Sequence, residues 1–201
     1  MDDRFELVRA SYGARAREYI DALGNIDHAD ASDLALIETW ARGLNGPVLD
    51  VGCGPGQWTH FLTGLGIETE GVDPVPQFIA SAKTTYPGER YRLGRAESLG
   101  VADGSLGGIL AWYSLIHTEP EKIGTALTEF ARTIRPGGGL ALGFFTGPRL
   151  VPFAHAVTTA YSWPLDLLTT KVEDAGFVIT HTESRPLSPT RTHGAILAQR
   201  A

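Results

Sequence analysis

Three alternating glycines form the first segment of this sequence that could build a ligand site. Gly52, Gly54 and Gly56 directly follow the apolar run Val48-Leu49-Asp50-Val51. Because glycine has no side chain and tolerates positive φ, such a turn lets backbone amides lie close to the oxygen atoms of a ligand. The dinucleotide-binding pattern Gly-x-Gly-x-x-Gly is missed, since Gln57 takes the place of its last glycine. Taken alone, the turn fits a structural role equally well.

A carboxylate stands at the end of the next apolar run. Asp73 follows Gly71-Val72 and lies 17 positions after Gly56. A carboxylate at this position can accept hydrogen bonds from both hydroxyls of a ribose. The alternative interpretation is an ordinary strand-end or capping aspartate before Pro74. The turn and Asp73 reinforce each other, and together they predict a site for a ligand that carries a ribose.

The elements that must position these residues alternate between strands and helices. Apolar runs predict strands at 48–51, 68–72, 91–93, 108–113 and 139–145. Helical periodicity predicts helices at 57–65, 74–85 and 119–134, preceded by a helix that Ser32 or Asp33 caps and Gly43 ends. This alternation is typical of a parallel sheet covered by helices on both faces.

The last part of the chain predicts a different arrangement. Segments 177–184 and 192–200 are predicted strands, and the connection 185–191 between them is shorter than the dozen or so residues that a parallel crossover needs. The final strand should therefore run antiparallel. Residues 146–163 contain Pro148, Pro152 and several aromatic side chains, and they are expected to be irregular or weakly helical.

The segment Val48-Leu49-Asp50-Val51-Gly52-Cys53-Gly54-Pro55-Gly56, together with Gly71-Val72-Asp73, resembles the class I S-adenosylmethionine-dependent methyltransferases. Residues 94–99 are similar to the family's stretch beside adenine, although Arg95 stands where many relatives have Asp. Residues 111–117 resemble the fourth-strand end that borders cofactor and substrate, and residues 135–139 resemble the turn before the fifth strand. The resemblance covers roughly Trp40 to the C-terminus.

The fold that this resemblance implies is α/β, in one small, methyltransferase-11-like domain over residues 1–201. Its Rossmann-like sheet is seven-stranded and mostly parallel, with strand order 3-2-1-4-5-7-6 and helices on both faces. The last strand is antiparallel, which agrees with the short connection at 185–191.

The implied cofactor is S-adenosyl-L-methionine, with S-adenosyl-L-homocysteine as its product. Residues 12–19 are similar to a leader helix that folds over the cofactor in many members, so residues 1–30 are expected to form a helical lid, with Arg15 near the cofactor's carboxylate end. Alternatively, Tyr12 and Tyr19 form one core-facing stripe of a helix. The residues expected to contact the cofactor are Tyr12, Tyr19, Asp50, Gly52, Cys53, Gly54, Gln57, Trp58, Asp73, Pro74, Ala96, Glu97, Trp112 and Tyr113.

The expected reaction is an in-line displacement, in which alignment of the reactants supplies much of the rate. An acceptor that must lose a proton needs a general base, and His117 is the candidate because it follows the fourth strand's carboxyl end. The alternative is a histidine that only packs or caps a helix. The acceptor is expected to be a partly apolar small molecule, bounded by Tyr113, His117, Phe145, His155, Tyr161 and Trp163.

The composition argues against several other classes. A length of 201 residues with 43% hydrophobic suits one core, and a net charge of -6 disfavours a nucleic-acid partner. Cys53 has no second cysteine to pair with, the N-terminus lacks a signal pattern, and no apolar run approaches the roughly 20 residues that cross a bilayer. We therefore expect a soluble, cytoplasmic monomer or homodimer with no membrane partner. The six histidines lack zinc-ligand spacing, so no metal is expected.

Two other functions stay open at this point. An NAD-dependent oxidoreductase would share the glycine turn and the acidic strand end, although Gln57 counts against it. A non-catalytic S-adenosylmethionine-binding module would share the whole cofactor site, because the cofactor and acceptor pockets are predicted independently.

Overall fold

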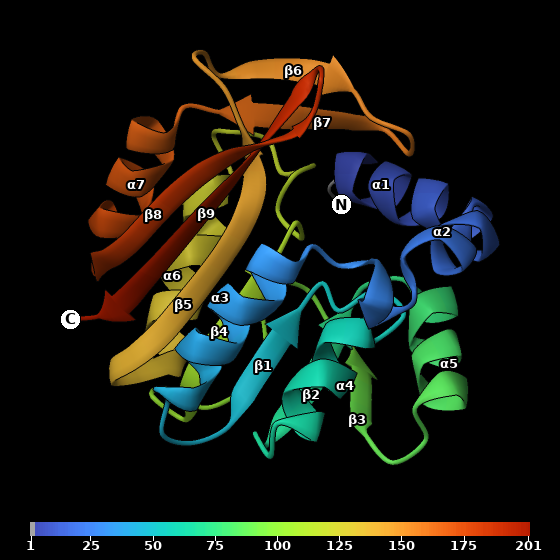
Figure 1. Cartoon of the computed structure of the whole chain (residues 1–201), viewed down its shortest axis with the longest axis horizontal. Coiled ribbons are helices and arrows are strands. Elements are labelled where there is room, and N and C mark those ends of the chain that lie inside the picture. Colours follow the sequence, from blue (N-terminus) through green and yellow to red (C-terminus); the bar gives the residue numbers. More distant parts are fainter. Residues whose placement is uncertain (1–2) are drawn as a thin grey trace.

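The computed structural model describes residues 3–201 and shows a twisted central sheet flanked by helices (Figure 1). Its helices are α1 (Asp3–Ala14), α2 (Ala16–Leu23), the short 3-10 helix η1 (Ile26–His28), α3 (Ala31–Arg42), α4 (Gln57–Gly64), α5 (Pro76–Thr85), α6 (Ile123–Thr133) and α7 (Leu165–Asp174). Its strands are β1 (Val48–Val51), β2 (Thr69–Asp73), β3 (Arg90–Leu93), β4 (Leu106–Trp112), β5 (Ile134–Thr146), β6 (Val151–Ala154), β7 (Thr159–Trp163), β8 (Phe177–Ser188) and β9 (Arg191–Arg200).

The parallel part of the sheet is centred on β1, which lies between β2 and β4, with β3 and β5 outside them. On the far side of β5, β9 runs antiparallel to β5 and β8 runs antiparallel to β9. With β9 and β8 counted as the seventh and sixth strands, this is the predicted order 3-2-1-4-5-7-6 with its antiparallel last strand. The carboxyl ends of β1, β2 and β4 consequently meet at one edge of the sheet, which is where an open α/β sheet binds its ligands.

The strand count is where the prediction is wrong, because the described chain forms nine strands rather than seven. Residues 146–163, expected to be irregular or weakly helical, contain the hairpin β6–β7. β7 extends the sheet by pairing with the end of β5, Phe145 opposite Ser162. Pro152 is tolerated because β6 has no partner beyond β7, so the absent N–H breaks no ladder.

Two helix boundaries also differ from the prediction. The N-cap of α3 is Asp30, whose side chain accepts a 2.8 Å hydrogen bond from the backbone N–H of Ser32, so neither Ser32 nor Asp33 caps it. Asp33 is instead buried inside the first turn. Helix α7 was not predicted, although Leu168 and Val172 are one turn apart and both buried.

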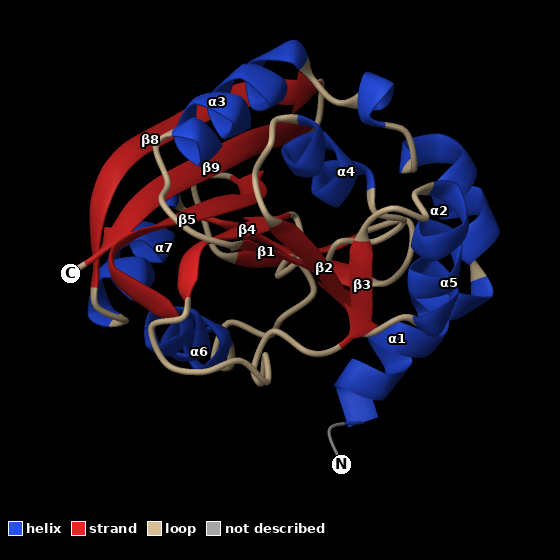
Figure 2. Ribbon diagram, turned by 90° about the horizontal axis from the view of Figure 1, so that it is seen from below, coloured by secondary structure: helices blue, strands red, loops and turns tan. Residues whose placement is uncertain are grey.

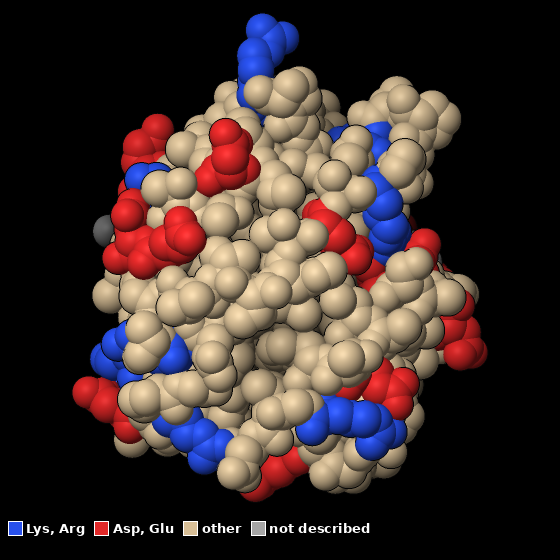
Figure 3. All heavy atoms as spheres, turned by 60° about the vertical axis from the view of Figure 1, so that its left-hand side comes forward, with Lys and Arg blue, Asp and Glu red and all other residues tan. Residues whose placement is uncertain are grey.

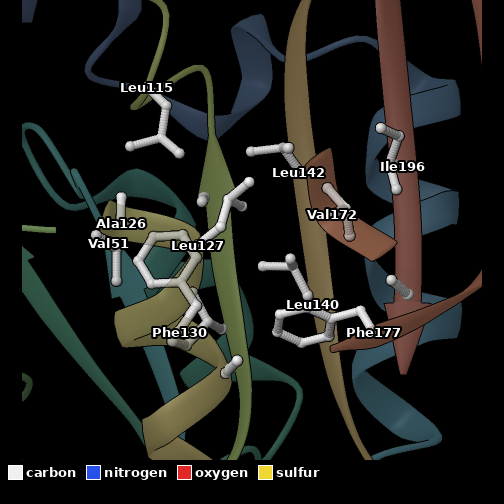
Figure 4. Close-up of a cluster of buried hydrophobic side chains, with 14 of the residues drawn as sticks. Val51, Leu115, Ala126, Leu127, Phe130, Leu140, Leu142, Val172, Phe177 and Ile196 are labelled. Atoms are coloured by element: carbon white, nitrogen blue, oxygen red, sulfur yellow. The ribbon is translucent and has the colours of Figure 1, made fainter. Parts of the chain in front are cut away.

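Helices cover both faces of the sheet (Figure 2). Helices α6 and α7 cover one face, where Leu127 and Phe130 of α6 meet Leu140 and Leu142 of β5 in a continuous apolar layer (Figure 4). Helices α3 and α4 cover the other face through Ile37, Trp40, Trp58 and Leu62. Burial of this layer fixes the sheet rigidly, which holds the strand ends of the site in place.

The surface carries charges of both signs. On the face in Figure 3, Lys and Arg side chains lie in small groups beside Asp and Glu, around a largely uncharged centre. Residues 3–201 contain no helix that is both long and apolar enough to cross a membrane.

Candidate functional site

The glycine turn between β1 and α4 is built from backbone that only glycine adopts readily. The φ angles of Gly52, Gly54 and Gly56 are 73°, 55° and 93°. A Cβ on Gly52 would lie 2.3 Å from Cβ of Ser114, and a Cβ on Gly56 would lie 2.7 Å from the hydroxyl of Tyr91. Gly54 differs, because its Cβ would meet only the ring of Tyr19 at 3.8 Å. The outer two glycines are therefore required by crowding, while the middle one leaves space above the turn.

Asp73 joins the turn to the end of β2. Its carboxylate accepts hydrogen bonds from the backbone N–H of Gly54 at 3.0 Å and of Val75 at 2.8 Å. The side chain is buried, and burial raises the pKa of Asp73 to about 6 although both backbone hydrogen bonds act in the opposite direction. Each carboxylate oxygen keeps further acceptor capacity, so Asp73 can also receive hydroxyl donors from a ligand.

Asp50 lies beneath the turn rather than in front of it. Its carboxylate accepts a 2.7 Å hydrogen bond from the hydroxyl of Thr59 on α4. Burial, assisted by the charge of Asp73, raises the pKa of Asp50 to about 7. Asp50 therefore ties β1 to α4 from below.

One cavity of about 1100 Å³, measured out to its open mouth, lies over these strand ends. Its walls come from α1, α2, the glycine turn, the start of α5 and the segment after β4. The predicted site residues that line it are Tyr12, Tyr19, Gly52, Gly54, Asp73, Pro74, Ala96, Glu97, Trp112, Tyr113 and His117. These are most of the residues predicted to contact the cofactor, together with the candidate base.

Other predicted contacts lie outside this cavity wall, namely Asp50, Cys53, Gln57, Trp58, Phe145, His155, Tyr161 and Trp163. Trp58 packs in the core with Leu62, Cys53 is buried against Ile79, and Trp163 is a core residue. Phe145 and His155 form a layer behind the wall, where Phe145 contacts the ring of Tyr113 and His155 that of His117, with centroids 5.0 and 5.2 Å apart.

The cavity is roofed by contacts between the N-terminal helices and the far end of the sheet. Nδ1 of His117 lies 2.7 Å from the carbonyl oxygen of Thr159 on β7, and Nε2 lies 2.8 Å from the hydroxyl of Tyr12 on α1. A carbonyl only accepts, so in neutral His117 the proton is on Nδ1 and the Tyr12 hydroxyl donates to Nε2. Burial raises the pKa of Tyr12, which keeps that hydroxyl protonated.

Arg15 adds a second contact across the roof. Its guanidinium donates to the carbonyl oxygen of Ala156, in the turn between β6 and β7, and it also pairs with Glu18. Arg15 does not line the cavity, in contrast to its predicted position near the cofactor. The hairpin that the sequence analysis missed is therefore the partner of the N-terminal helices.

Several cavity residues were not predicted. Val8 lies one helical turn before Tyr12 on α1, and Phe78 lies on α5 against the rings of Tyr12 and Tyr19. Helical spacing from Tyr12 could have identified Val8. Arg95, where many relatives have Asp, also lines the cavity, and its side chain pairs with Glu97 at 3.4 Å. Ser114, shortly after the end of β4, lines the cavity as well.

Comparison with known proteins relates the chain to methyltransferases. A family model described as a methyltransferase domain matches residues 48–138, the stretch from β1 to the start of β5. An uncharacterized methyltransferase of Mycobacterium tuberculosis (strain H37Rv) is 34% identical over 95 residues, which are 47% of this chain and 38% of that protein. A malonyl-[acyl-carrier protein] O-methyltransferase of Pseudescherichia vulneris is 31% identical over 134 residues, which are 67% of this chain and 51% of that protein. The chain thus spans about half or less of these two relatives.

A solved structure matches over nearly the whole chain. The 1,6-didemethyltoxoflavin-N1-methyltransferase of Burkholderia thailandensis, with bound 1,6-didemethyltoxoflavin and S-adenosylhomocysteine, aligns with a TM-score of 0.78 at 20% identity, covering 98% of this chain and 88% of that one. The chain thus has the Rossmann-like fold of this methyltransferase. These comparisons support the class I S-adenosylmethionine-dependent methyltransferase family.

Proposed function

We propose that this protein transfers a methyl group from S-adenosylmethionine to a small-molecule acceptor by in-line displacement. The observation that carries the proposal is that one cavity contains the glycine turn and Asp73 together with Tyr113 and His117. A cofactor held at the first pair would extend towards the second pair, where an acceptor can approach.

The residues of the cavity fit the proposed cofactor. A side chain at Gly54 would project towards Tyr19, so glycine keeps this part of the cavity open. Asp73 would accept hydrogen bonds from the ribose hydroxyls, and Ala96 and Glu97 would border the adenine. Tyr12, Tyr19 and Phe78 form an aromatic layer that would exclude water. Bound S-adenosylmethionine would supply a methyl group on a positively charged sulfur.

Helices α1 and α2 act as a lid in this proposal. They pack on α5 through the apolar cluster of Tyr12, Tyr19 and Phe78, and they reach the far side of the cavity through the Tyr12–His117 and Arg15–Ala156 hydrogen bonds. Breaking those two hydrogen bonds would open the cavity to ligands, and forming them again would exclude water. When the lid opens, it would move away from the β6–β7 hairpin at the acceptor end.

His117 is the proposed general base for an acceptor that carries a proton. Its Nδ1 is held by Thr159, which directs Nε2 into the cavity towards Tyr12. An acceptor that displaces the Tyr12 hydroxyl would meet an unprotonated nitrogen. His117→Gln should then lower turnover by about 100-fold or more, with S-adenosylhomocysteine affinity little changed. Turnover equal to that of the wild type would exclude this role.

The class of acceptor is a choice between a carboxyl oxygen and a ring nitrogen. The relative from Pseudescherichia vulneris is named for malonyl-acyl-carrier protein, and the neighbour from Burkholderia thailandensis for a nitrogen heterocycle. The largely apolar and aromatic walls near Tyr113 support a flat, partly apolar small molecule. A panel of short-chain dicarboxylic thioesters and aromatic nitrogen heterocycles would therefore test both chemistries.

Thermal unfolding with added ligand tests the cofactor. S-adenosylhomocysteine at 100 times its dissociation constant should stabilise the protein by about 2.7 kcal/mol. Asp73→Asn should abolish most of this effect, because an amide cannot accept from both backbone N–H groups and the ribose, whereas the exposed Asp174→Asn should retain it. Stabilisation by NAD and not by S-adenosylhomocysteine would establish the oxidoreductase alternative.

Methyl transfer itself requires a separate assay. Radiolabelled S-adenosylmethionine incubated with the acceptor panel should give labelled product that depends on the protein and on Asp73. Ligand stabilisation without transfer to any acceptor would favour the non-catalytic binding module.

A further inference from the structure

Tyr113 has an unusual backbone conformation for its position in the cavity. Its φ is 57°, which among the described residues is the only positive φ outside glycine. A bulky residue in this region is strained and persists only where its surroundings hold it. The residue lies directly after β4, and its ring lines the cavity between the proposed cofactor and acceptor positions.

The side chain of Tyr113 is held at its far end by a histidine on another strand. The Tyr113 hydroxyl lies 2.6 Å from Nδ1 of His193 on β9, while its backbone N–H donates to Gly143 on β5 at 2.9 Å. His193 is completely buried, so its ring cannot move without disturbing β9. Burial also raises the pKa of Tyr113, so its hydroxyl stays protonated and able to donate.

Charged groups on the other side of His193 determine which nitrogen carries its proton. Nε2 of His193 faces Oδ1 of Asp33 at 3.6 Å and Oε1 of Glu183 at 3.7 Å. Two carboxylates attract an N–H group and repel a nitrogen lone pair. The neutral ring should therefore carry its proton on Nε2, which leaves Nδ1 to accept from Tyr113.

The carboxylates are themselves fixed by Arg185. Its guanidinium donates to Asp33, pairs with Asp30 at 3.3 Å and lies 3.7 Å from Glu183. Trp112, the residue before Tyr113, donates its indole N–H to Asp33 at 3.4 Å. Groups from α3, β4, β8 and β9 thus enclose the imidazole, and burial lowers the pKa of His193, which keeps it neutral.

We propose that His193 is a positioning residue that accepts the Tyr113 hydroxyl proton in a hydrogen bond and thereby holds the strained Tyr113 ring in place as the cavity wall. Asp33, Glu183 and Arg185 support it by fixing its tautomer. The inference rests on the proposed function only in that S-adenosylhomocysteine is used as the probe of the cavity. His193 acts through Tyr113 and does not line the cavity itself.

Nitrogen NMR of the histidine rings tests the proposed hydrogen bond between Tyr113 and His193, called the tether below, without any ligand. At neutral pH, His193 should give the signals of a neutral ring with its proton on Nε2 and an unprotonated Nδ1. These signals are assigned to His193 because they should be absent in His193→Gln. Tyr113→Phe should shift the unprotonated nitrogen downfield, because it loses its donor. A proton on Nδ1, or a doubly protonated ring, would contradict the proposed tether.

Binding of S-adenosylhomocysteine, measured by calorimetry, tests the consequence for the cavity. Tyr113→Phe should weaken binding by about 2- to 10-fold, the effect of one net hydrogen bond. His193→Leu should weaken it at least as much, and His193→Gln less, since a glutamine oxygen can still accept. Tyr86→Phe is the matched control, because its hydroxyl bonds Gly24 outside the cavity.

The double variant of Tyr113 and His193 distinguishes a histidine that holds Tyr113 from one that only stabilises the fold. Adding Tyr113→Phe to His193→Leu should weaken binding no further, because the shared hydrogen bond is already lost. Additive losses, or unchanged affinity in Tyr113→Phe, would overturn the inference. If wild-type protein fails to bind S-adenosylhomocysteine, the proposed function fails, and the NMR result still decides the tether.

A metal is the competing explanation for this cluster, since the donor atoms of Asp33, Glu183 and His193 lie within 4.8 Å of one another. The positive charge of Arg185 beside them opposes a bound cation. Zinc that copurifies in stoichiometric amount and is lost in His193→Gln would overturn the positioning role.

Discussion

The hydroxyl of Tyr12 and Nε2 of His117 lie 2.8 Å apart, although the two residues are 105 positions apart in the chain. This hydrogen bond joins the proposed lid to the segment after β4, directly over the cavity. Tyr12→Phe removes it and keeps the aromatic contacts with Tyr19 and Phe78. The affinity for S-adenosylhomocysteine should fall by about 2- to 10-fold, since a net hydrogen bond contributes roughly 0.5 to 1.5 kcal/mol. Calorimetry measures this change, and an unaltered affinity would mean that the contact does not close the cavity over its ligand.

The contact of Arg15 with the β6–β7 turn gives a second prediction for the lid. Arg15→Met removes the guanidinium that donates to Ala156 but keeps an unbranched, flexible side chain. S-adenosylhomocysteine should then dissociate about 2- to 10-fold faster, again the size of one hydrogen bond, as measured by stopped-flow fluorescence. Arg17→Met is the control, since Arg17 lies two residues later and is exposed in the first turn of α2. Equal rates in both variants would show that the hairpin contact is dispensable.

The sequence predicts which residues meet at the glycine-turn end of the cavity because that end is local. β1, the glycine turn and α4 are consecutive, and Asp73 follows on the neighbouring strand, so spacing alone brings them together. Gly52 and Asp73 were identified from type and position without any long-range information. Parallel strands alternating with helices then determine which strand ends meet.

The acceptor end could not be predicted in the same way, because its contacts join distant parts of the chain. The hairpin β6–β7 joins the sheet where Ser162 pairs with Phe145 at the end of β5, and prolines in the segment obscured its strand pattern. His193 was discarded for lack of ligand spacing, yet it contacts Tyr113 from 80 positions away. No periodicity within a short segment predicts a contact between residues so far apart in the sequence. Trp58, predicted as a cofactor contact from its place at the start of α4, packs in the core and does not line the cavity.

Two glycines test how far the turn depends on the absence of a side chain. Gly52→Ala places a methyl group 2.3 Å from Cβ of Ser114 at a φ of 73°. Strain and overpacking together should destabilise the protein by about 2 to 4 kcal/mol and abolish ligand binding. Gly124→Ala, within α6 and with no atom within 4 Å of the added carbon, should stabilise by about 0.5 to 1 kcal/mol. Urea unfolding measures both, and a loss of stability in Gly124→Ala similar to that in Gly52→Ala would show that crowding at the turn is not the cause.

Asp50 should make the ligand-free protein less stable as the pH rises. Its folded pKa of about 7 is above the ordinary value of 3.8, so the folded state binds the proton more tightly than the unfolded state. The resulting stabilisation is complete below pH 4 and is lost as the pH rises through 7. Asp73, with a folded pKa of about 6, acts in the same direction over a narrower range.

Asp50→Asn isolates this contribution from the other titrating groups. The amide oxygen can still accept from Thr59, and no charge is buried at any pH. The free energy of unfolding of the variant minus that of the wild type should therefore increase by about 2 to 3 kcal/mol between pH 5 and pH 8, at 1.36 kcal/mol per pH unit up to the folded pKa. Urea unfolding at both pH values gives this difference, and Asp174→Asn on the exposed face of α7 should leave it near zero. A difference that stays constant with pH would mean that Asp50 is ionised in the folded protein throughout this range, and that burial does not raise its pKa into it.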